Sequence, residues 1–352
     1  MSDDILFDEI GRWGVVTLNR PSALNALNLP MVAAFHEKLL AWETAPHVAA
    51  VMVKGAGGKA FCAGGDIRVI YENARTDPEG VAAFFREEYK NNVAIHRFPK
   101  PFVAMIDGIV MGGGVGVSVH GDFRVVGDRT MFAMPETGIG LFPDVGGGYF
   151  MPRLHDGLGL YYALTGARAK AADCMAAGVG THYAPGDDMA ALEKDLMEAS
   201  LGGHPHADIE AVLDAHAGDP GHAAVNDRRD QIKAHFENPA SLQSLLDSLA
   251  ADGGQFATET LETLNRMSPT SMAITFEQMR RGHGLDFEDV MRMEFRIVRR
   301  ILEGHDFFEG VRAQIIDKDR NPTWSPAALR DVAAGDVDKY FEPLGAAELE
   351  LS

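Results

Sequence analysis

The chain has 352 residues, of which 46% are hydrophobic, and its formal net charge at pH 7 is −19. This length and apolar content can bury a sizeable core, so we expect one large domain with an added region. The acidic balance argues against nucleic acid or an anionic membrane surface as the main partner, because phosphate binding needs clustered Lys and Arg.

Two further features concern the cellular compartment. Only Cys62 and Cys174 are present, too few for a disulfide framework. The start of the sequence, MSDDILFDEIGRWG, is acidic and has neither the cationic start of a signal peptide nor the Arg-rich pattern of a transit peptide. The longest uncharged apolar run, residues 109–119, is too short to span a bilayer. We expect a cytoplasmic protein with no membrane partner.

The first third of the chain alternates strand and helix patterns. Apolar residues alternate over 13–18, which predicts a strand, and Asn28 with Pro30 signals the start of a helix. A buried strand is predicted over 49–55, and it runs into the glycine-rich segment GAGGKAFCAGGDI at 55–67.

A second strand pattern, over residues 102–106, also leads to a glycine-rich turn, Gly112, Gly113 and Gly114. Small apolar residues at 115–119 are expected to start a helix. Such turns at strand ends are where α/β folds place ligands, and glycine allows close approach to the backbone. We expect this turn and the pair Gly64 and Gly65 to offer one amide each to the same ligand atom, as an oxyanion site.

Three carboxylates stand out near these turns. Glu136 and Asp144 lie in MPETGIGLFPD, which holds few charges, and an apolar pocket would raise their pKa values and make them useful acids or bases. The alternative is that both side chains only cap the turns that follow them. Glu88 lies in the helical segment 81–97, where it either faces a pocket or belongs to a solvated surface.

After about residue 186 the sequence predicts helices. We place the domain division at 1–200, a core with the ligand site, and 201–352, a helical region that covers the site or mediates assembly. Five apolar residues give the penultimate helix a buried face. They are Val290, Met293, Phe295, Ile297 and Ile301.

Several site classes lack their motifs. The glycines near residue 112 do not form GxGxxG, because Val117 stands where the last glycine is needed, and no P-loop is present. The histidines form no HExxH and pair with no cysteine cluster, so no metal is expected.

Four segments together resemble the enoyl-CoA hydratase/isomerase (crotonase) superfamily. They are NRPSALNAL at 19–27, KAFCAGGDI at 59–67, the triple glycine at 112–114 and MPET at 134–137. Further segments, FFREEY at 84–89, FAMPETGIGLFPDVGGGYF at 132–150 and GHDFFEGVRAQIIDKDRNPTW at 304–324, resemble the 3-hydroxyisobutyryl-CoA hydrolases of that superfamily, thioesterases of valine degradation.

The resemblance implies an α/β fold, a crotonase-like spiral of repeated ββα units with a C-terminal α-helical region. It implies an oxyanion hole formed by the amides of Gly65 and Gly113, with Glu136 and Asp144 as the other catalytic residues. The residues that it places against the substrate are Glu88, Gly113, Glu136 and Asp144. Those that it places against the CoA part are Ala23, Ala63, Gly64, Asp66 and Ile67. CoA is part of the substrate, so no separate cofactor is expected.

One departure from the hydratase pattern favours hydrolysis. Hydratases position a water with two glutamates, and the first falls two residues after the triple glycine, where this chain has Gly116. Hydrolysis of a thioester needs one main acid or base and the oxyanion hole. A hydratase or double-bond isomerase, and a noncatalytic acyl-CoA-binding protein, remain alternatives. The exposed faces of the C-terminal helices would suit a homo-oligomer such as a trimer.

Overall fold

The protein is described by a computed structural model that covers residues 3–351. Its chain forms two compact units, each built from three segments. The first unit comprises residues 3–65, 90–132 and 168–226, and the second comprises 66–89, 133–167 and 227–351. Each is described by itself.

The first unit contains a six-stranded sheet in the order β1-β2-β3-β5-β7-β10. Only β1 runs antiparallel to its neighbour, and the other pairs are parallel. The strands are β1 (Ile5–Ile10), β2 (Trp13–Leu18), β3 (Ala50–Gly55), β5 (Phe102–Ile106), β7 (Phe123–Val126) and β10 (His182–Tyr183). β2, β3 and β5 are buried nearly throughout, as parallel strands covered on both faces are. The strands predicted over 13–18, 49–55 and 102–106 are confirmed.

A second, four-stranded sheet has the order β4-β6-β8-β9. Its strands are β4 (Ala60–Cys62), β6 (Ile109–Met111), β8 (Met131–Ala133) and β9 (Ala169–Lys170). Three times in succession the chain passes from the large sheet to this small one, from β3 to β4, from β5 to β6 and from β7 to β8. This repetition, with a helix or a helical turn after each pair, is the predicted spiral of ββα units.

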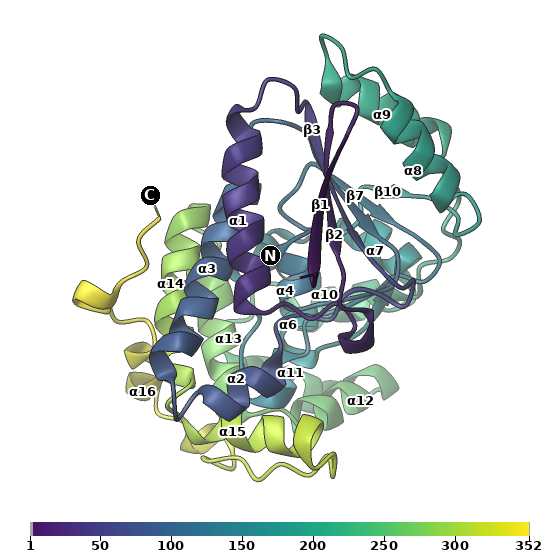
Figure 1. The fold of residues 1–352 in the computed structure, drawn as a ribbon. Coiled ribbons are helices and arrows are strands. Elements are labelled where there is room, and N and C mark those ends of the chain that lie inside the picture. The colour runs from purple at the N-terminus through teal and green to yellow at the C-terminus, as the bar shows by residue number, and fades with distance from the viewer. Residues whose placement is uncertain (1–2, 352) are drawn as a thin grey trace. The chain divides into compact units, whose positions relative to one another are not determined.

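Helices complete the first unit: η1 (Pro21–Ala23), α1 (Leu29–Thr44), α4 (Gly113–Gly116), α7 (Ala171–Ala177), α8 (Met189–Glu198) and α9 (Pro205–Ala215). α8 and α9 lie beside the large sheet (Figure 1), and Leu192, Leu196 and Ile209 join the strand residues in one core. The indole of Trp13 in β2 donates a hydrogen bond to the carbonyl of Leu196 at 2.7 Å.

Local sequence explains where two of these helices begin and end. The side chain of Asn28 accepts a hydrogen bond from the amide of Met31 and caps α1, as predicted. The helix expected from residues 115–119 is wrong in its extent, because α4 is one turn that ends at Gly116. Glycine and valine are weak helix formers, and Ser118 turns its hydroxyl back onto the carbonyl of Gly114 at 2.8 Å.

The second unit is almost entirely helical. Its helices are α2 (Ile67–Asn73), the first part of α3 (Pro78–His96), η2 (Glu136–Ile139), α5 (Gly147–Phe150), η3 (Met151–Arg153), α6 (Leu158–Thr165), the last two residues of η4 (Ala224–Arg228), α10 (Arg229–Phe236), α11 (Leu242–Asp252), α12 (Gln255–Leu264), α13 (Pro269–Gly282), α14 (Phe287–Ile301), α15 (His305–Val311), η5 (Arg312–Ile316), η6 (Leu329–Asp331), α16 (Ala334–Lys339) and η7 (Gly345–Ala347). All five apolar residues predicted for the penultimate helix are buried in α14.

Beyond β10 the described chain forms helices and connecting loops, so the predicted C-terminal helical region is confirmed. The division after residue 200 stays a prediction. None of the helices in the described part of the chain is long and apolar enough to cross a membrane.

Candidate active site

In the first unit, the two glycine-rich turns approach each other closely. A Cβ built on Gly64 would lie 3.2 Å from the carbonyl oxygen of Met111 and 3.4 Å from the amide nitrogen of Gly113. The backbone of Gly64 has φ +105°, which side chains rarely adopt. The prediction that these turns lie together is therefore confirmed, and glycine is required at Gly64 for both space and conformation.

The amides of Gly65 and Gly113 remain available in this arrangement. Gly113 opens α4, where an N–H group has no carbonyl one turn earlier to bond. Leu27 pairs with Gly65 as an isolated parallel bridge, but the bond beside it runs from the amide of Leu27 to the carbonyl of Gly64. Among the turn and loop hydrogen bonds of residues 3–351, neither amide is a donor. Two such amides can stabilise an oxyanion, although that role stays a prediction.

The positions expected to hold CoA surround the same turn. Ala23 ends η1, and the amide of Ala63 donates to the carbonyl of Leu24 at 3.0 Å, which joins the two segments of the motif. Asn25, missed from the sequence, fixes this contact. Its buried side-chain amide donates to the carbonyls of Ala56 and Ala60, each at 2.9 Å. The two segments are thus held together by backbone and amide contacts.

Asp66 and Ile67 mark the start of α2 in the second unit. The carboxylate of Asp66 caps this helix by accepting a hydrogen bond from the amide of Val69 at 3.4 Å. Ile67 is the first helical residue and is half-buried. The structure thus gives Asp66 a local role in addition to the predicted contact with CoA.

The second unit gathers the three predicted carboxylates. Glu88 in α3, Glu136 at the start of η2 and Asp144 in the following loop are all buried, with exposed fractions of 2%, 6% and 4%. Burial is the main cause that raises the pKa of each group, and the charge of Asp144 raises the pKa values of Glu88 and Glu136 further. The three groups therefore interact electrostatically.

Asp144 differs from the other two because it has a strong partner. The hydroxyl of Tyr89 donates a hydrogen bond to its carboxylate at 2.8 Å. This bond offsets part of the effect of burial, and the pKa of Asp144 is raised to about 6. In contrast, Oε1 of Glu88 and Oε2 of Glu136 have no hydrogen-bond partner within the described chain. Buried, unpaired polar atoms of this kind are typical of a site that awaits a ligand or water.

The structure also decides between the alternatives for these carboxylates. A solvated position for Glu88 is excluded by its burial. Asp144 is not a side-chain cap, because α5 has Gly146 at its N-cap position and the carboxylate of Asp144 binds Tyr89 instead. Glu136 is the first residue of η2, and the N-cap position of this turn is held by Pro135. The catalytic role of the three side chains stays a prediction.

Sequence reasoning missed three other polar residues of the second unit, Tyr89, Gln278 and Glu294. Glu294 is fully buried in α14, and its carboxylate accepts hydrogen bonds from the amides of Gly146 and Gly148, each at 2.8 Å. Burial raises the pKa of Glu294 to about 8. A glutamate within the apolar stripe of α14, between Val290 and Val298, was the signal in the sequence.

Two asparagines on α3, which continues into the first unit, were also missed. Asn91 and Asn92 are fully buried, and their side-chain amides have no hydrogen-bond partner in residues 3–351. They follow Glu88 by three and four residues, so the geometry of the helix puts them on the same side of α3.

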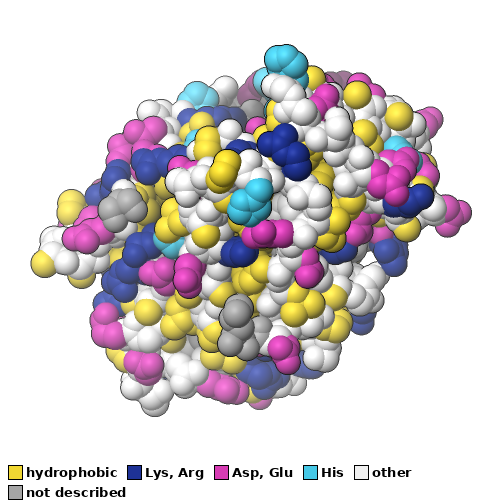
Figure 2. All heavy atoms as spheres, turned by 45° about the horizontal axis from the view of Figure 1, so that its top comes forward, with side chains coloured by type: hydrophobic (Ala, Val, Ile, Leu, Met, Phe, Trp, Pro, Cys, Tyr) yellow, Lys and Arg dark blue, Asp and Glu magenta, His cyan; other side chains and the backbone are white. Residues whose placement is uncertain are grey.

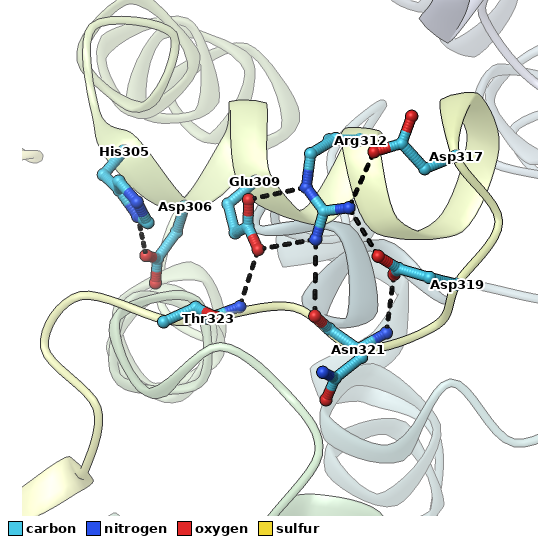
Figure 3. Close-up of polar contacts among 8 residues, drawn as sticks. All are labelled: His305, Asp306, Glu309, Arg312, Asp317, Asp319, Asn321 and Thr323. Carbon is cyan, nitrogen blue, oxygen red and sulfur yellow. Dashed lines mark hydrogen bonds and ion pairs between the residues drawn. The ribbon is translucent and has the colours of Figure 1, made fainter.

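The charged residues of the C-terminal motif GHDFFEGVRAQIIDKDRNPTW bind one another (Figure 3). The guanidinium of Arg312 donates to the carboxylates of Glu309, Asp317 and Asp319 at 2.6–2.9 Å. The carboxylate of Glu309 also accepts from the amide of Thr323 at 2.7 Å, and the pKa of Glu309 is lowered to about 2, chiefly by Arg312. These contacts fold residues 309–323 back on themselves, so the charges of the motif stabilise the segment.

No group of three or more His, Cys, Asp or Glu side chains in the described part of the chain is arranged to hold a metal ion. On the face drawn in Figure 2, the side chains of Lys and Arg lie interspersed with those of Asp and Glu. The absence of a metal and of a nucleic-acid partner both stay predictions.

Comparison with known proteins decides the family. A family profile described as Enoyl-CoA hydratase/isomerase matches residues 13–341. The chain belongs to the enoyl-CoA hydratase/isomerase family. This membership confirms the fold inferred from the glycine-rich turns and the MPET segment.

Several curated relatives of this family member share one name. The chain is 45% identical to 3-hydroxyisobutyryl-CoA hydrolase, mitochondrial, of Xenopus tropicalis over 99% of its own length and 91% of the relative's. It is 44% identical to the protein of the same name from Homo sapiens, with the same two coverages. These names place the vertebrate relatives in mitochondria, which does not test the cytoplasmic location predicted here.

Solved structures of the family carry other names. A carnitinyl-CoA dehydratase from Mycobacterium thermoresistibile is 39% identical with a TM-score of 0.92, and the match covers 100% of this chain and 99% of that one. An enoyl-CoA hydratase from Rhodobacter sphaeroides is 34% identical with a TM-score of 0.88, covering 99% and 100%. The fold is therefore shared along the whole chain with proteins named as dehydratase or hydratase.

Proposed function

We propose that the protein hydrolyses the thioester of 3-hydroxyisobutyryl-CoA to 3-hydroxyisobutyrate and free CoA, a reaction of valine degradation. The names of the relatives at about 45% identity support this activity. The observation that carries it is the glutamate pattern, because Glu136 is buried with a raised pKa while Gly116 stands where a hydratase has its other glutamate.

The first step would be attack on the thioester carbonyl. Glu136 either removes a proton from the attacking water or attacks the carbonyl itself and forms a short-lived anhydride that water then cleaves. Burial raises the pKa of Glu136, which strengthens it as a base in the fraction that is ionised. The two roles give the same products.

The second requirement is stabilisation of the charge that develops on the carbonyl oxygen. The amides of Gly65 and Gly113 would donate to this oxygen, an effect worth about 3 kcal/mol per donor. The thiol of CoA then leaves as a thiolate, and because thiols have pKa values near ~8.5, departure needs no strong acid. The Gly65 and Gly113 donors and Glu136 thus suffice for hydrolysis.

Glu88 and Asp144 are two further carboxyl groups that a simple thioester hydrolysis does not require. We propose that one of them binds the hydroxyl of the substrate and the other holds the water. Glu88 has a buried oxygen without a partner, which a hydroxyl would satisfy. No separate cofactor takes part, since CoA belongs to the substrate, and a cytoplasmic homo-oligomer remains the proposed setting.

The experiment compares three esters with purified protein. Free thiol is measured with 3-hydroxyisobutyryl-CoA and isobutyryl-CoA, and loss of the double bond is measured with crotonyl-CoA. We expect kcat/KM for the hydroxylated ester to exceed that for the plain ester by up to ~10⁴, because a site built to bind a hydroxyl rejects an analogue without it. The variants Asp144→Asn and Glu88→Gln identify the partner, as the preference should collapse in one of them.

Two outcomes would contradict the proposal. Equal values for the two esters would indicate a general acyl-CoA thioesterase. Rapid loss of the double bond of crotonyl-CoA without thiol release from either ester would indicate a hydratase, as the similar protein from Rhodobacter sphaeroides is named.

A further inference from the structure

The backbone that follows Asp144 is held in an unusual conformation. Val145 has φ +52° and Gly146 has φ +84°, so two successive residues lie in the left-handed region. Glycine adopts this region freely, but a β-branched residue such as valine is a clear outlier there. A turn of this kind persists only where its surroundings hold it, and such strain is common next to functional groups.

Two side chains from the C-terminal helices hold the turn. Oε2 of Glu294 accepts from the amide of Gly146 and Oε1 from the amide of Gly148, both at 2.8 Å. Nε2 of Gln278 donates to the carbonyl of Pro143 at 2.8 Å and to Oε1 of Glu294 at 3.0 Å. The contacts therefore fall on both sides of Asp144, one residue before it and two and four residues after it.

The chemistry of these contacts leaves one arrangement. Nε2 of Gln278 lies against two acceptors, which assigns the NH₂ end of its amide group to this side, while Oε1 of Gln278 is buried with no hydrogen-bond partner in the described chain. The side chain of Glu294 accepts from two backbone amides at once, one at each of its oxygens. An apolar residue at position 294 would fill the space, but it would leave the amides of Gly146 and Gly148 buried without a partner.

Packing leaves the turn little room to shift. A Cβ on Gly148 would lie 3.1 Å from both Cγ of Gln278 and Oε1 of Glu294. A Cβ on Gly282, at the end of α13, would lie 2.0 Å from the carbonyl oxygen of Gly148. The backbone of α13 thus lies directly against the turn at Gly148, while α14 reaches the turn through the side chain of Glu294.

We infer that Glu294 and Gln278 are positioning residues for Asp144, a clamp that holds the left-handed turn at Val145 and Gly146 and thereby sets the place of the Asp144 carboxylate against Tyr89. Neither side chain is assigned contact with the substrate. The inference rests on the proposed function to the extent that Asp144 takes part in the hydrolysis.

The test uses two variants and a matched control in the full chain. Glu294→Gln keeps the size of the side chain but turns an NH₂ group toward one of the two amides. Gln278→Leu removes the bonds to Pro143 and Glu294 and serves if the first variant does not fold. The control, Glu277→Gln on the same helix α13, loses its ion pairs with Arg280 and Arg281 and does not touch the turn.

We expect kcat for 3-hydroxyisobutyryl-CoA to fall about 10²-fold in Glu294→Gln and about 10-fold in Gln278→Leu, since small misplacements of catalytic groups have effects of this size. KM should change less than roughly two-fold, because neither residue binds the ester. Glu277→Gln should keep the wild-type kcat even where its melting temperature falls. A purely structural role would lower the melting temperature of Glu294→Gln and leave kcat of the folded protein unchanged, and that result would overturn the inference.

A crystal structure of each variant separates this inference from the proposed function. We expect the hydrogen bond between Tyr89 and Asp144, 2.8 Å in the wild type, to be broken or lengthened in both variants and kept in the control. The distance between Tyr89 and Asp144 can be measured even if the wild-type protein cleaves no ester. A wild-type protein without activity would count against the proposed function and not against the clamp. An unchanged turn and an unchanged Tyr89–Asp144 distance in both variants would refute the clamp.

Discussion

The carboxylate of Asp144 is subject to two opposing effects. Burial raises its pKa and the hydrogen bond from Tyr89 lowers it, and the net pKa is about 6, so Asp144 is ionised at neutral pH. The pKa of Tyr89 is itself raised by burial and by the nearby carboxylates, which keeps its hydroxyl protonated as a donor. The ionised carboxylate of Asp144 and the protonated hydroxyl of Tyr89 therefore form a stable hydrogen-bonded pair.

Tyr89→Phe removes one oxygen atom and tests whether the hydrogen bond to Asp144 sets the pKa of that carboxyl group. Loss of the donor should raise the pKa of Asp144 above about 6, and the corresponding ionisation in the pH dependence of kcat/KM should move to higher pH. The measurement is kcat/KM for 3-hydroxyisobutyryl-CoA between pH 5 and 8. Tyr161→Phe, within the cluster of Phe236 and Phe256, is the control. An unshifted profile in Tyr89→Phe would mean that the hydrogen bond does not set this ionisation.

For single residues, the sequence predicted which side chains are important better than which residues they contact. A segment with few charges predicts that Glu136 and Asp144 are buried with raised pKa values, and their burial is confirmed. The contact of Glu294 with Gly146 was not predicted, because it joins positions 148 residues apart and depends on the packing of α14. Only the place of a glutamate in an apolar stripe pointed to it.

Among the elements, the two glycine-rich turns depend on the smallest side chain for different reasons. Gly64 needs a conformation that side chains rarely adopt, whereas Gly114 needs space, since a Cβ there would lie 2.2 Å from the carbonyl oxygen of Cys62. The closeness of these turns was predictable, because both follow strands of one sheet and parallel strands end at the same edge.

Gly114→Ala tests how rigidly the turns are fixed. We expect a loss of about 1–3 kcal/mol in the free energy of unfolding, because the added methyl group must displace the backbone of Cys62. The control is Gly335→Ala in α16, where a Cβ meets no atom within 4 Å and should stabilise the helix by up to ~1 kcal/mol. Thermal unfolding measures both. Equal melting temperatures for wild type and Gly114→Ala would show that the turn moves aside.

The lengths of the elements explain what the sequence missed. β2, β3, β5, α1 and α14 are long enough to show a periodic pattern, and all were predicted. β4, β6, β8 and β9 have two or three residues each, so no period can be read from them, and a whole sheet went undetected. The short α4 was overestimated for a related reason, since valines and glycines alone do not sustain a helix.

For the whole molecule, the buried carboxyl groups make stability depend on pH. The pKa of Asp144 is raised from 3.8 to about 6 and that of Glu294 from 4.5 to about 8, and burial raises those of Glu88 and Glu136 as well. At a pH between the ordinary pKa and the raised pKa of such a group, the group is protonated in the folded protein and ionised in the unfolded chain. The free energy of unfolding therefore falls as pH rises through this window.

We expect this free energy, measured by denaturant unfolding, to fall from pH 5 to pH 8. Each group that is still protonated only in the folded state contributes up to about 1.4 kcal/mol per pH unit. Glu294→Gln should show a shallower fall, because one of the four groups no longer titrates. Below about pH 4 the free energy of unfolding should instead fall as the pH falls. The reason is that the pKa values of Asp156 and Glu309 are lowered to about 2 in the folded protein. Constant or rising stability of the wild type from pH 5 to 8 would contradict this account.

The division of the chain into units was the least predictable feature. Each unit is built from three separate segments, and the candidate carboxylates come from two segments of the second unit. Composition changes along a sequence reveal boundaries between consecutive regions, but they do not reveal an exchange of segments between units. The family membership and the spiral of ββα units were nevertheless evident from the short motifs.

The central claim is thioester hydrolysis with Glu136 as the base or nucleophile, and release of free thiol from 3-hydroxyisobutyryl-CoA tests it most directly. The wild-type protein should release one thiol for each ester consumed. Glu136→Gln, which keeps the size of the side chain, should bind the ester and release thiol at least ~10²-fold more slowly. Thiol release by Glu136→Gln at the wild-type rate, or none by the wild type, would contradict the account.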